Sequence, residues 1–330
     1  MTSILETSAY WVTGPGVGEL RKVRVPDHPD DGNSLVQAEF GGVSPGTERL
    51  VGLGLVAPDC ATRMACRYMD GGFELPVKYG YSLVGTCISG ALTDRRLFVM
   101  HPHQGLAQIE DADAVLLPED FPAPRATLIP NTETALNAVW DASLALGETS
   151  VIVGGGPVGL LIAFVLNQLE LGPTTIVDVD EQRLRLVESL SFVDNVLPLD
   201  ELPDESSSLA FHSTGTSAGL QASLGAIGFE GRVIDLSWYG SRPVTLNLGA
   251  DFHYGRKRIL ASQVGAIAPS RRDSHTRADR LREVLDLLVD PSVDALLSPP
   301  VEFSDLPEFM RGLYAGNSSH PVPLIRYETN

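Results

Sequence analysis

Cysteine, positive charge and long apolar runs are all scarce in this sequence. The three cysteines, Cys60, Cys66 and Cys87, form an odd and sparse set, which argues against a disulfide framework and indicates a reducing compartment. Lysine and arginine number 24 against 42 acidic residues, and the net charge of −18 argues against nucleic acid or an anionic membrane surface as a partner. No run approaches the roughly 18 apolar residues of a membrane span, so none is expected.

The first ten residues also lack a basic segment and a long apolar core, so no secretory signal is expected and the cytoplasm is the predicted location. The chain does have length and apolar content. Its 330 residues, 43% of them hydrophobic, are enough for two domains that each bury a core. We expect the excess acidic residues to lie on the solvated surface of the protein.

A glycine-rich stretch, residues 151–159, carries the strongest functional signal. Three β-branched residues predict a short buried strand, and an apolar helix is expected from Leu160 onward. Between them lie Gly154, Gly156, Pro157, Val158 and Gly159, with the glycines at G-x-G-x-x-G spacing. The first glycine permits the tight turn, the second lets backbone approach a pyrophosphate, and the third lets the helix pack on the sheet. The pyrophosphate would bind free N–H groups at the positive end of the helix dipole.

The following strand separates this stretch from an ordinary glycine-rich turn. Residues 174–178 read as a second strand that ends in Asp178, nineteen residues after Gly159, where a ribose-binding carboxylate is expected. Asp178 favours NAD over NADP, because its charge would repel a 2′-phosphate and no arginine follows it immediately. Arg183 and Arg185 lie on the next predicted helix, and we expect both to be solvated.

The chain changes its pattern along its length. Residues 1–125 are rich in glycine, proline and short β-type runs, which predicts a β-rich domain. Residues 126–265 alternate strands with helices, which predicts the α/β class and a doubly wound parallel sheet. Residues 266–330 hold one clear helix, 276–289, and a terminal strand, 321–327, and are expected to fold back onto the first domain.

Several motifs, taken together, resemble the medium-chain dehydrogenase/reductase superfamily over essentially the whole chain. They are Gly42-Val43-Ser44-Pro45-Gly46-Thr47-Glu48, Gly80-Tyr81-Ser82-Leu83-Val84-Gly85, the stretch 151–159 with Asp178, and the strand that begins Gly231-Arg232-Val233. The resemblance implies a GroES-like catalytic domain beside a Rossmann domain, and hydride transfer to or from a nicotinamide cofactor.

The sequence departs from that superfamily where its alcohol dehydrogenases bind zinc. Ser44 stands at the position of a ligand cysteine, and Tyr81 stands at the position of the histidine in a G-H-E motif. The third ligand's region holds Asn131 and Thr132, with Glu133 near, and a lobe of four cysteines is missing. Because catalytic zinc needs three protein ligands, we predict no metal. The motifs look like a zinc-free branch that includes bacteriochlorophyllide-type 3-hydroxyethyl dehydrogenases and related biosynthetic proteins.

Without zinc, another group must polarise a carbonyl or take an alcohol proton. The resemblance places Tyr81 and Ser44 toward the nicotinamide, so Tyr81 is predicted to donate a hydrogen bond to the substrate oxygen, and Ser44 or Thr47 to relay the proton. The alternative is that Tyr81 and Ser44 only line the pocket. His101 and His103 are predicted to complete a proton path, and the alternative is a turn with satisfied histidines. Glu48 is expected to anchor its turn.

Further residues are assigned to the cofactor by their position. Ser213, Thr214 and Gly215 follow the fourth strand of the nucleotide domain, and His212 just before them is expected to lie beside the cofactor. The resemblance places Thr132, with Asn131 and Thr134, near the nicotinamide. A last strand, residues 258–264, is expected at the sheet edge, where pairing with a second copy would give a homodimer.

The predicted activity is transfer of a hydride between NAD(H) and a secondary alcohol or ketone of a small biosynthetic metabolite. Two alternatives stay open: reduction of an activated double bond, as in quinone and enoyl reductases, and dinucleotide binding without catalysis. The fold alone cannot decide among them.

Overall fold

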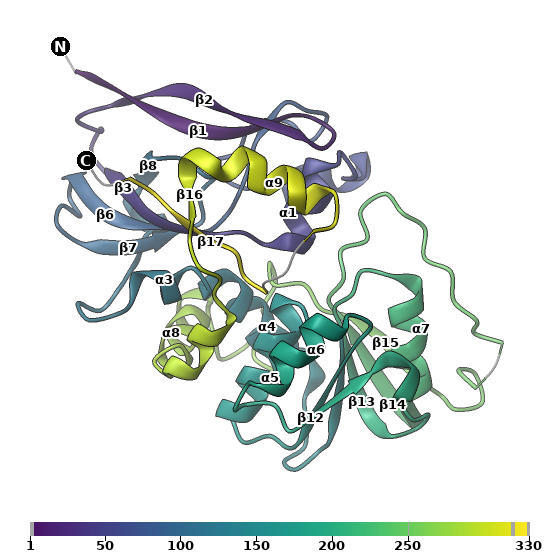
Figure 1. Cartoon of the computed structure of the whole chain (residues 1–330). Coiled ribbons are helices and arrows are strands. Elements are labelled where there is room, and N and C mark those ends of the chain that lie inside the picture. The colour runs from purple at the N-terminus through teal and green to yellow at the C-terminus, as the bar shows by residue number, and fades with distance from the viewer. Residues whose placement is uncertain (1–2, 250, 318–320, 329–330) are drawn as a thin grey trace. The chain divides into compact units, whose positions relative to one another are not determined.

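The computed structural model describes residues 3–249, 251–317 and 321–328. The chain forms two compact units, the first from Met1–Pro130 with Leu297–Asn330 and the second from Asn131–Leu296. The first is rich in strands and the second holds a parallel sheet covered by helices (Figure 1). The predicted α/β class is confirmed.

The first unit is built from two sheets. Its strands are β1 (Ile4–Gly14), β2 (Val17–Pro26), β3 (Asn33–Gly42), β4 (Asp70–Gly71), β5 (Val77–Lys78), β6 (Leu83–Gly90), β7 (Arg96–Val99), β8 (Leu106–Glu110), β9 (Val115–Leu116), β16 (Val301–Glu302) and β17 (Leu324–Arg326). Among the described residues, one sheet has the order β2-β1-β5-β4, and the other has the order β16-β17-β3-β6-β7-β9 with β8 also paired to β3. The C-terminal β17 pairs antiparallel with β3, so both ends of the chain build this unit.

Short helices connect the strands of the first unit. They are α1 (Pro45–Gly52), α2 (Ala61–Met64), α3 (Ala123–Ala126) and α9 (Leu306–Tyr314). α1 positions the S-P-G-T-E motif, because Ser44 is its N-cap residue and Pro45 begins it, where proline is tolerated. α9 buries Leu306, Met310 and Leu313 on one face, which is the spacing of an amphipathic helix.

The second unit is a parallel sheet with helices packed on it. Its strands are β10 (Ser150–Val153), β11 (Thr174–Asp178), β12 (Asn195–Pro198), β13 (Ser207–His212), β14 (Ile227–Asp235) and β15 (Arg258–Ala261), and its helices are α4 (Ile129–Ala142), α5 (Pro157–Gln168), α6 (Glu181–Glu188), α7 (Ser217–Ala226) and α8 (Arg277–Leu287). The strand order is β12-β11-β10-β13-β14-β15, and neighbouring strands are parallel.

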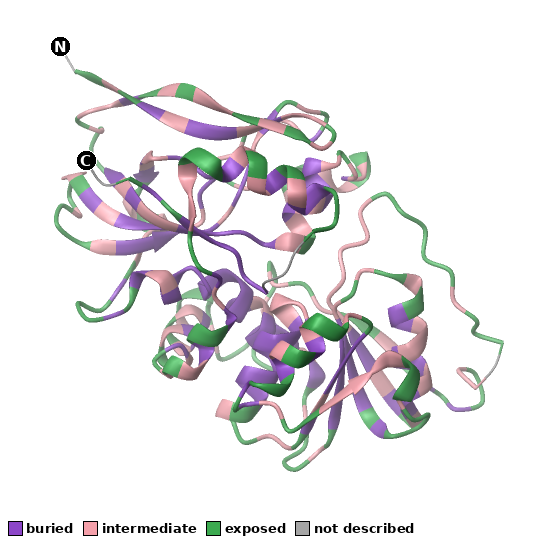
Figure 2. Ribbon diagram, viewed as in Figure 1, coloured by how far each residue is buried: buried purple, intermediate pink, exposed green. Residues whose placement is uncertain are grey.

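The core of the second unit explains why β10 reads as a continuous apolar run. All four residues of β10 are buried, and α5 buries an almost unbroken stretch from Gly159 to Leu166 (Figure 2). A strand covered on both faces has no solvated side, so its sequence does not alternate. The carboxyl ends of β10, β11 and β13 carry the glycine turn, Asp178 and His212, at the edge where parallel sheets bind ligands.

The unit boundaries differ from the predicted ones. Residues 266–296 were expected in the first domain but group with the second unit. A buried ion pair accounts for this, since Arg280 of α8 donates to Glu133 of α4 at 2.8 Å and to the backbone oxygen of Val264 at 2.7 Å. An arginine on a helix usually lies at the protein surface, so the sequence pattern did not predict the ion pair between Arg280 and Glu133.

No helix in the described residues is long and apolar enough to cross a membrane.

Candidate functional site

The glycine turn of the second unit has the geometry of a pyrophosphate cradle. Gly154 adopts φ +115°, a left-handed conformation that favours glycine. A Cβ on Gly159 would lie 1.9 Å from the backbone oxygen of Gly154, so no side chain fits there. A Cβ on Gly156 would meet nothing within 4 Å, so this side of the turn is open. α5 begins at Pro157 without a side-chain cap, which leaves backbone N–H groups for an anion.

Asp178 lies where the sequence predicted it, at the end of β11, and it also organises the turn. Its Oδ2 accepts from the backbone N–H of Gly155 at 2.7 Å, and its Oδ1 accepts from the N–H groups of Val179 and Asp180 at 2.8 and 3.0 Å. The carboxylate is buried. Asp178 is thus oriented toward the glycine turn by the backbone itself.

The expectation that Arg183 is solvated is wrong. Its Nη1 donates to Oδ2 of Asp178 at 2.9 Å, and its side chain is 34% exposed. Arg183 lies in the first turn of α6, and Asp180 caps that helix by accepting from the N–H groups of Gln182 and Arg183. The cap places the guanidinium over the carboxylate. Arg185, by contrast, is exposed and pairs only with Glu181 within its helix.

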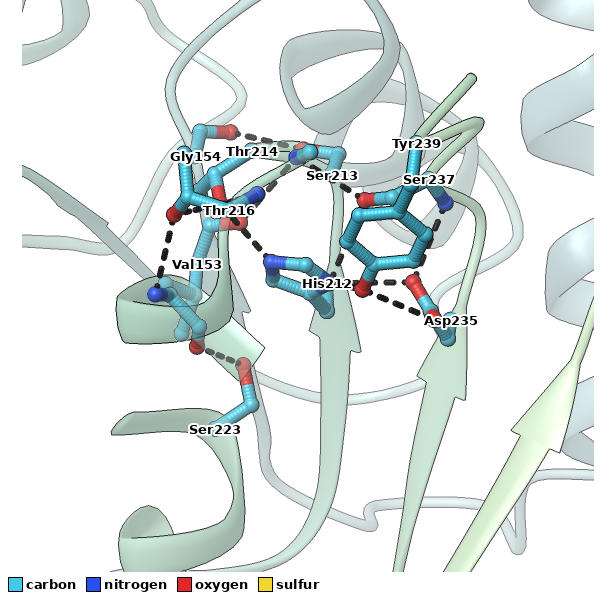
Figure 3. A network of polar contacts seen from close by, with 12 residues as sticks. Val153, Gly154, His212, Ser213, Thr214, Thr216, Ser223, Asp235, Ser237 and Tyr239 are labelled. Carbon is cyan, nitrogen blue, oxygen red and sulfur yellow. Dashed lines mark hydrogen bonds and ion pairs between the residues drawn. The ribbon is translucent and has the colours of Figure 1, made fainter. Parts of the chain in front are cut away.

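A polar network lies at the ends of β13 and β14 (Figure 3). His212 is fully buried, with Nδ1 2.9 Å from Oδ1 of Asp235 and Nε2 2.7 Å from Oγ1 of Thr214. Tyr239 stacks on the imidazole at 6.2 Å and donates to Asp235 at 3.0 Å. Although burial opposes it, the hydrogen bond with His212 helps to hold the pKa of Asp235 below its ordinary value.

This network connects the predicted cofactor residues to the glycine turn. Ser213 donates from its backbone N–H to Val153 at 3.0 Å and from its hydroxyl to Gly154 at 3.2 Å. Gly215 adopts φ +65° and donates its N–H to the hydroxyl of Ser237 at 3.0 Å. Ser213 and Thr214 therefore border the turn, next to His212 at the end of β13, while cofactor binding by the segment 213–215 stays a prediction.

The first unit holds a second polar cluster around Glu48. Its Oε1 accepts from the backbone N–H of Ser44 at 2.9 Å, and its Oε2 lies 2.9 Å from Nε2 of His103. Both Glu48 and His103 are buried, and the hydroxyl of Tyr327 lies 3.4 Å from Nδ1 of His103. Glu48 anchors its turn as expected. Gly80 makes room for this arrangement, because a Cβ there would lie 2.7 Å from the His103 ring.

Ser44 and Tyr81 come together in this cluster. The hydroxyl of Tyr81 shares hydrogen bonds with the side chains of Ser44 and Thr47. Burial raises the pKa of Tyr81 well above its ordinary value, against the lowering effect of these hydrogen bonds. Tyr81 therefore keeps its proton at neutral pH and can donate it as a hydrogen bond.

The structure separates the two histidines of the H-x-H motif. His101 does not join the Glu48 cluster: its Nδ1 lies 2.8 Å from the backbone oxygen of Pro102, and its ring packs 5.0 Å from that of Tyr68. Glu133 is held by Arg280 and is not a free base. Asn131 and Thr132 are buried at the start of α4.

These residues do not fit a catalytic zinc ion. Ser44 and Tyr81 supply hydroxyls, whereas protein zinc takes thiolate, imidazole and carboxylate ligands. Glu48 and His103 are of the right chemical types but bind each other. Across the described ranges, no group of three or more His, Cys, Asp or Glu residues could hold a metal ion.

Comparison with solved structures identifies the architecture. L-idonate 5-dehydrogenase from Escherichia coli superposes with a TM-score of 0.76 at 14% identity, over 98% of this chain and 99% of that one. A short chain alcohol dehydrogenase from Escherichia coli, solved with NADH, gives 0.76 at 14% identity over 97% and 99% of the two chains. The chain therefore shares the two-unit fold of these dehydrogenase structures.

Sequence comparison gives a more distant relation. An uncharacterized zinc-type alcohol dehydrogenase-like protein of Haemophilus influenzae is 23% identical over 256 residues, which cover 74% of this chain. The match spans 66% of that relative's length. No family model matches the chain. The solved structures therefore establish the fold, and the two polar clusters hold the residues that bear on activity.

Three contacts of the clusters were not predicted from the sequence, namely those of Arg183, Asp235 and Tyr327. Asp235 carried a signal, because it ends β14 one strand away from His212, and carboxyl ends of neighbouring parallel strands meet. Tyr327 lies on the far end of the chain, and only the pairing of β17 with β3 brings it to His103.

Proposed function

We propose that this protein is an NAD(H)-dependent oxidoreductase that exchanges a hydride with a secondary alcohol or ketone without using zinc. The single observation that carries the proposal is the hydrogen-bonded Ser44–Tyr81 pair, with Tyr81 protonated, at the positions where related enzymes hold a metal. The alcohol dehydrogenase fold and the glycine turn with Asp178 support the cofactor.

The residues present fit a dinucleotide. The open side of Gly156 and the uncapped start of α5 would hold the pyrophosphate, Asp178 would hold the adenosine ribose, and the segment 213–215 would border the nicotinamide half. When bound, the cofactor supplies or accepts the hydride.

Side-chain hydroxyl groups supply the proton that the substrate oxygen takes up. Tyr81 donates a hydrogen bond to the substrate oxygen, and its proton passes to that oxygen as a ketone becomes an alcohol. Ser44 and Thr47 share hydrogen bonds with Tyr81, and the partly exposed Thr47 passes a proton from solvent back to Tyr81 along these hydrogen bonds. Glu48 binds the backbone of Ser44 rather than its hydroxyl, so Glu48 and His103 hold the turn in place instead of relaying protons.

The variant Tyr81→Phe tests this role because it removes only the hydroxyl. We expect kcat for ketone reduction to fall roughly 10²-fold or more, the usual size of general acid assistance, with unchanged NADH affinity. The control is Tyr68→Phe, whose hydroxyl binds Asp113 outside the Glu48 cluster. Near-normal turnover by Tyr81→Phe would show that Tyr81 only lines the pocket and takes no part in proton transfer.

The assay also separates the alternatives. Turnover of enones but not of simple ketones would identify a double-bond reductase. Tight NADH binding without any turnover would identify a non-catalytic dinucleotide-binding protein. Elemental analysis of active protein purified without chelator should find no stoichiometric zinc; zinc at one per chain, or activity lost on chelation, contradicts the zinc-free mechanism.

We further propose a homodimer formed through β15. β15 is the edge strand of the parallel sheet, and its Leu260 is 39% exposed. An exposed edge offers unpaired backbone groups to a second copy. Light scattering at micromolar concentration should give twice the chain mass, and a monomer mass would refute the dimer.

A further inference from the structure

A cavity of about 400 Å³ opens in the first unit, apart from the Glu48 cluster. Its lining includes Tyr68, Lys78, His101 and Gln104, together with Arg24 of β2. None of Ser44, Glu48, Tyr81 or His103 contributes to its walls. Its size suits a small molecule, since ligand sites start at about 300 Å³.

His101 presents a hydrogen-bond acceptor at this cavity. The residue is 3% exposed, and because Nδ1 lies 2.8 Å from the backbone oxygen of Pro102, that nitrogen carries the hydrogen. Burial lowers the pKa of His101 to about 3, so the ring is neutral at physiological pH. Its Nε2 is then a bare acceptor, and it has no hydrogen-bond partner within the described part of the chain. An acceptor that has no protein partner and belongs to a cavity-lining residue is available to a hydrogen-bond donor of a ligand.

The cavity also carries unmatched positive charge. Lys78 is half-buried and donates to the neutral Oε1 of Gln104 at 3.0 Å, and burial lowers the pKa of its ammonium. The guanidinium of Arg24 forms no ion pair among the residues described. Asp70 is the one carboxylate in the lining, so two cations face one anion in a chain whose net charge is −18. Cations concentrated in an acidic protein favour an anionic ligand.

We propose that this cavity binds a small carboxylate whose neighbouring carbon carries a hydroxyl or ammonium group. Lys78 and Arg24 hold the carboxylate, and Nε2 of His101 accepts from the neighbouring donor. Asp70 lies in the same lining and favours the ammonium form, which makes a 2-amino acid the better ligand of the two. This site is independent of the proposed redox activity, because it shares no residue with either cluster.

Glycine, glycolate and acetate are the probes, added to the full chain and followed by calorimetry and by protein NMR. Glycine and glycolate share the carboxylate and differ in the donor, while acetate has no donor. We expect saturable binding of glycine or glycolate, and acetate weaker by roughly tenfold, the value of one hydrogen bond to a charged or buried group. Equal binding of acetate, or no saturation by either donor-bearing probe at tens of millimolar, overturns the proposal.

Two variants assign the contacts. His101→Asn keeps a donor for Pro102 and removes the Nε2 acceptor, so it should bring glycolate down to the affinity of acetate. Lys78→Met keeps the aliphatic stem and should weaken all three probes about tenfold or more. Lys22→Met is the matched control on β2, since Lys22 is 68% exposed and pairs with Glu6 outside the cavity. Unchanged binding in both cavity variants, with NADH affinity intact as the test of folding, would refute the site.

Discussion

Replacing Arg183 by methionine should shift cofactor binding toward NAD and away from NADP. The proposed ribose site holds opposite charges 2.9 Å apart, the Asp178 carboxylate and the Arg183 guanidinium. Arg183 neutralises part of the charge that would repel a 2′-phosphate, and it offers that phosphate a cation. Methionine keeps the stem that lies against Gly155 and removes only the guanidinium.

The size of the effect follows from burial. The Asp178 side chain is 4% exposed but Arg183 is 34% exposed, so solvent screens the pair and its interaction is worth about 1 kcal/mol or less. Loss of the phosphate's cation and renewed repulsion by Asp178 act in the same direction. Together they predict a change of about 1–2 kcal/mol, or roughly 5- to 30-fold, in the ratio of the two dissociation constants.

Calorimetric titration of NADH and NADPH into the same preparation measures this ratio directly. Arg185→Met is the matched control, because Arg185 lies on the same helix and pairs only with Glu181. We expect the control to leave the ratio unchanged. A ratio in Arg183→Met within twofold of the parent, or a shift toward NADPH, would refute the role given to the Asp178–Arg183 pair. Substituting Asp178 is a poorer test, since its oxygens also hold the glycine turn.

Other substitutions test the remaining geometry. Gly156→Ala should fold normally, because its Cβ would meet nothing within 4 Å. If the pyrophosphate binds beside Gly156, this variant should bind NADH at least tenfold more weakly in calorimetric titrations. Gly312→Ala is the control, because a Cβ at Gly312 would also meet nothing within 4 Å. Arg280→Met should lower the free energy of unfolding by about 3–5 kcal/mol because it leaves Glu133 buried without its partner, whereas Arg277→Met, 59% exposed, should cost under about 1 kcal/mol in denaturant titrations. Arg232 lowers the pKa of Glu148 to about 2 from 4.5, so the ion pair stabilises the fold fully above pH 4.5 and is lost as pH falls toward 2. Glu148→Gln should therefore be less stable than the parent at neutral pH, and the gap should close in acid; a gap independent of pH would contradict this.

The sequence was sufficient for features with local periodic signals. The glycine spacing, the apolar β10 and the alternation of strands with helices predicted the parallel sheet and the place of Asp178. α9 was not predicted, although Leu306, Met310 and Leu313 have helical spacing, because a helix of nine residues carries only a short periodic signal. Arg183 and Arg280 could not have been placed, since a charged residue on a helix gives the same pattern whether it is solvated or reaches a buried carboxylate.

The first unit is assembled from both ends of the chain, and this has a consequence for how the protein is made. The hydroxyls of Tyr10 and Tyr314 lie 3.2 Å apart in the interior of this unit. One edge of β3 is paired only after β17 has been synthesised. During synthesis the N-terminal strands therefore leave the ribosome with an open sheet edge, which stays unpaired until β17 has emerged. The parallel-sheet unit is contiguous and can fold first. In a circular permutant that begins near Leu297, the two segments of the first unit would be adjacent in the sequence. This permutant should aggregate less during translation than the parent protein.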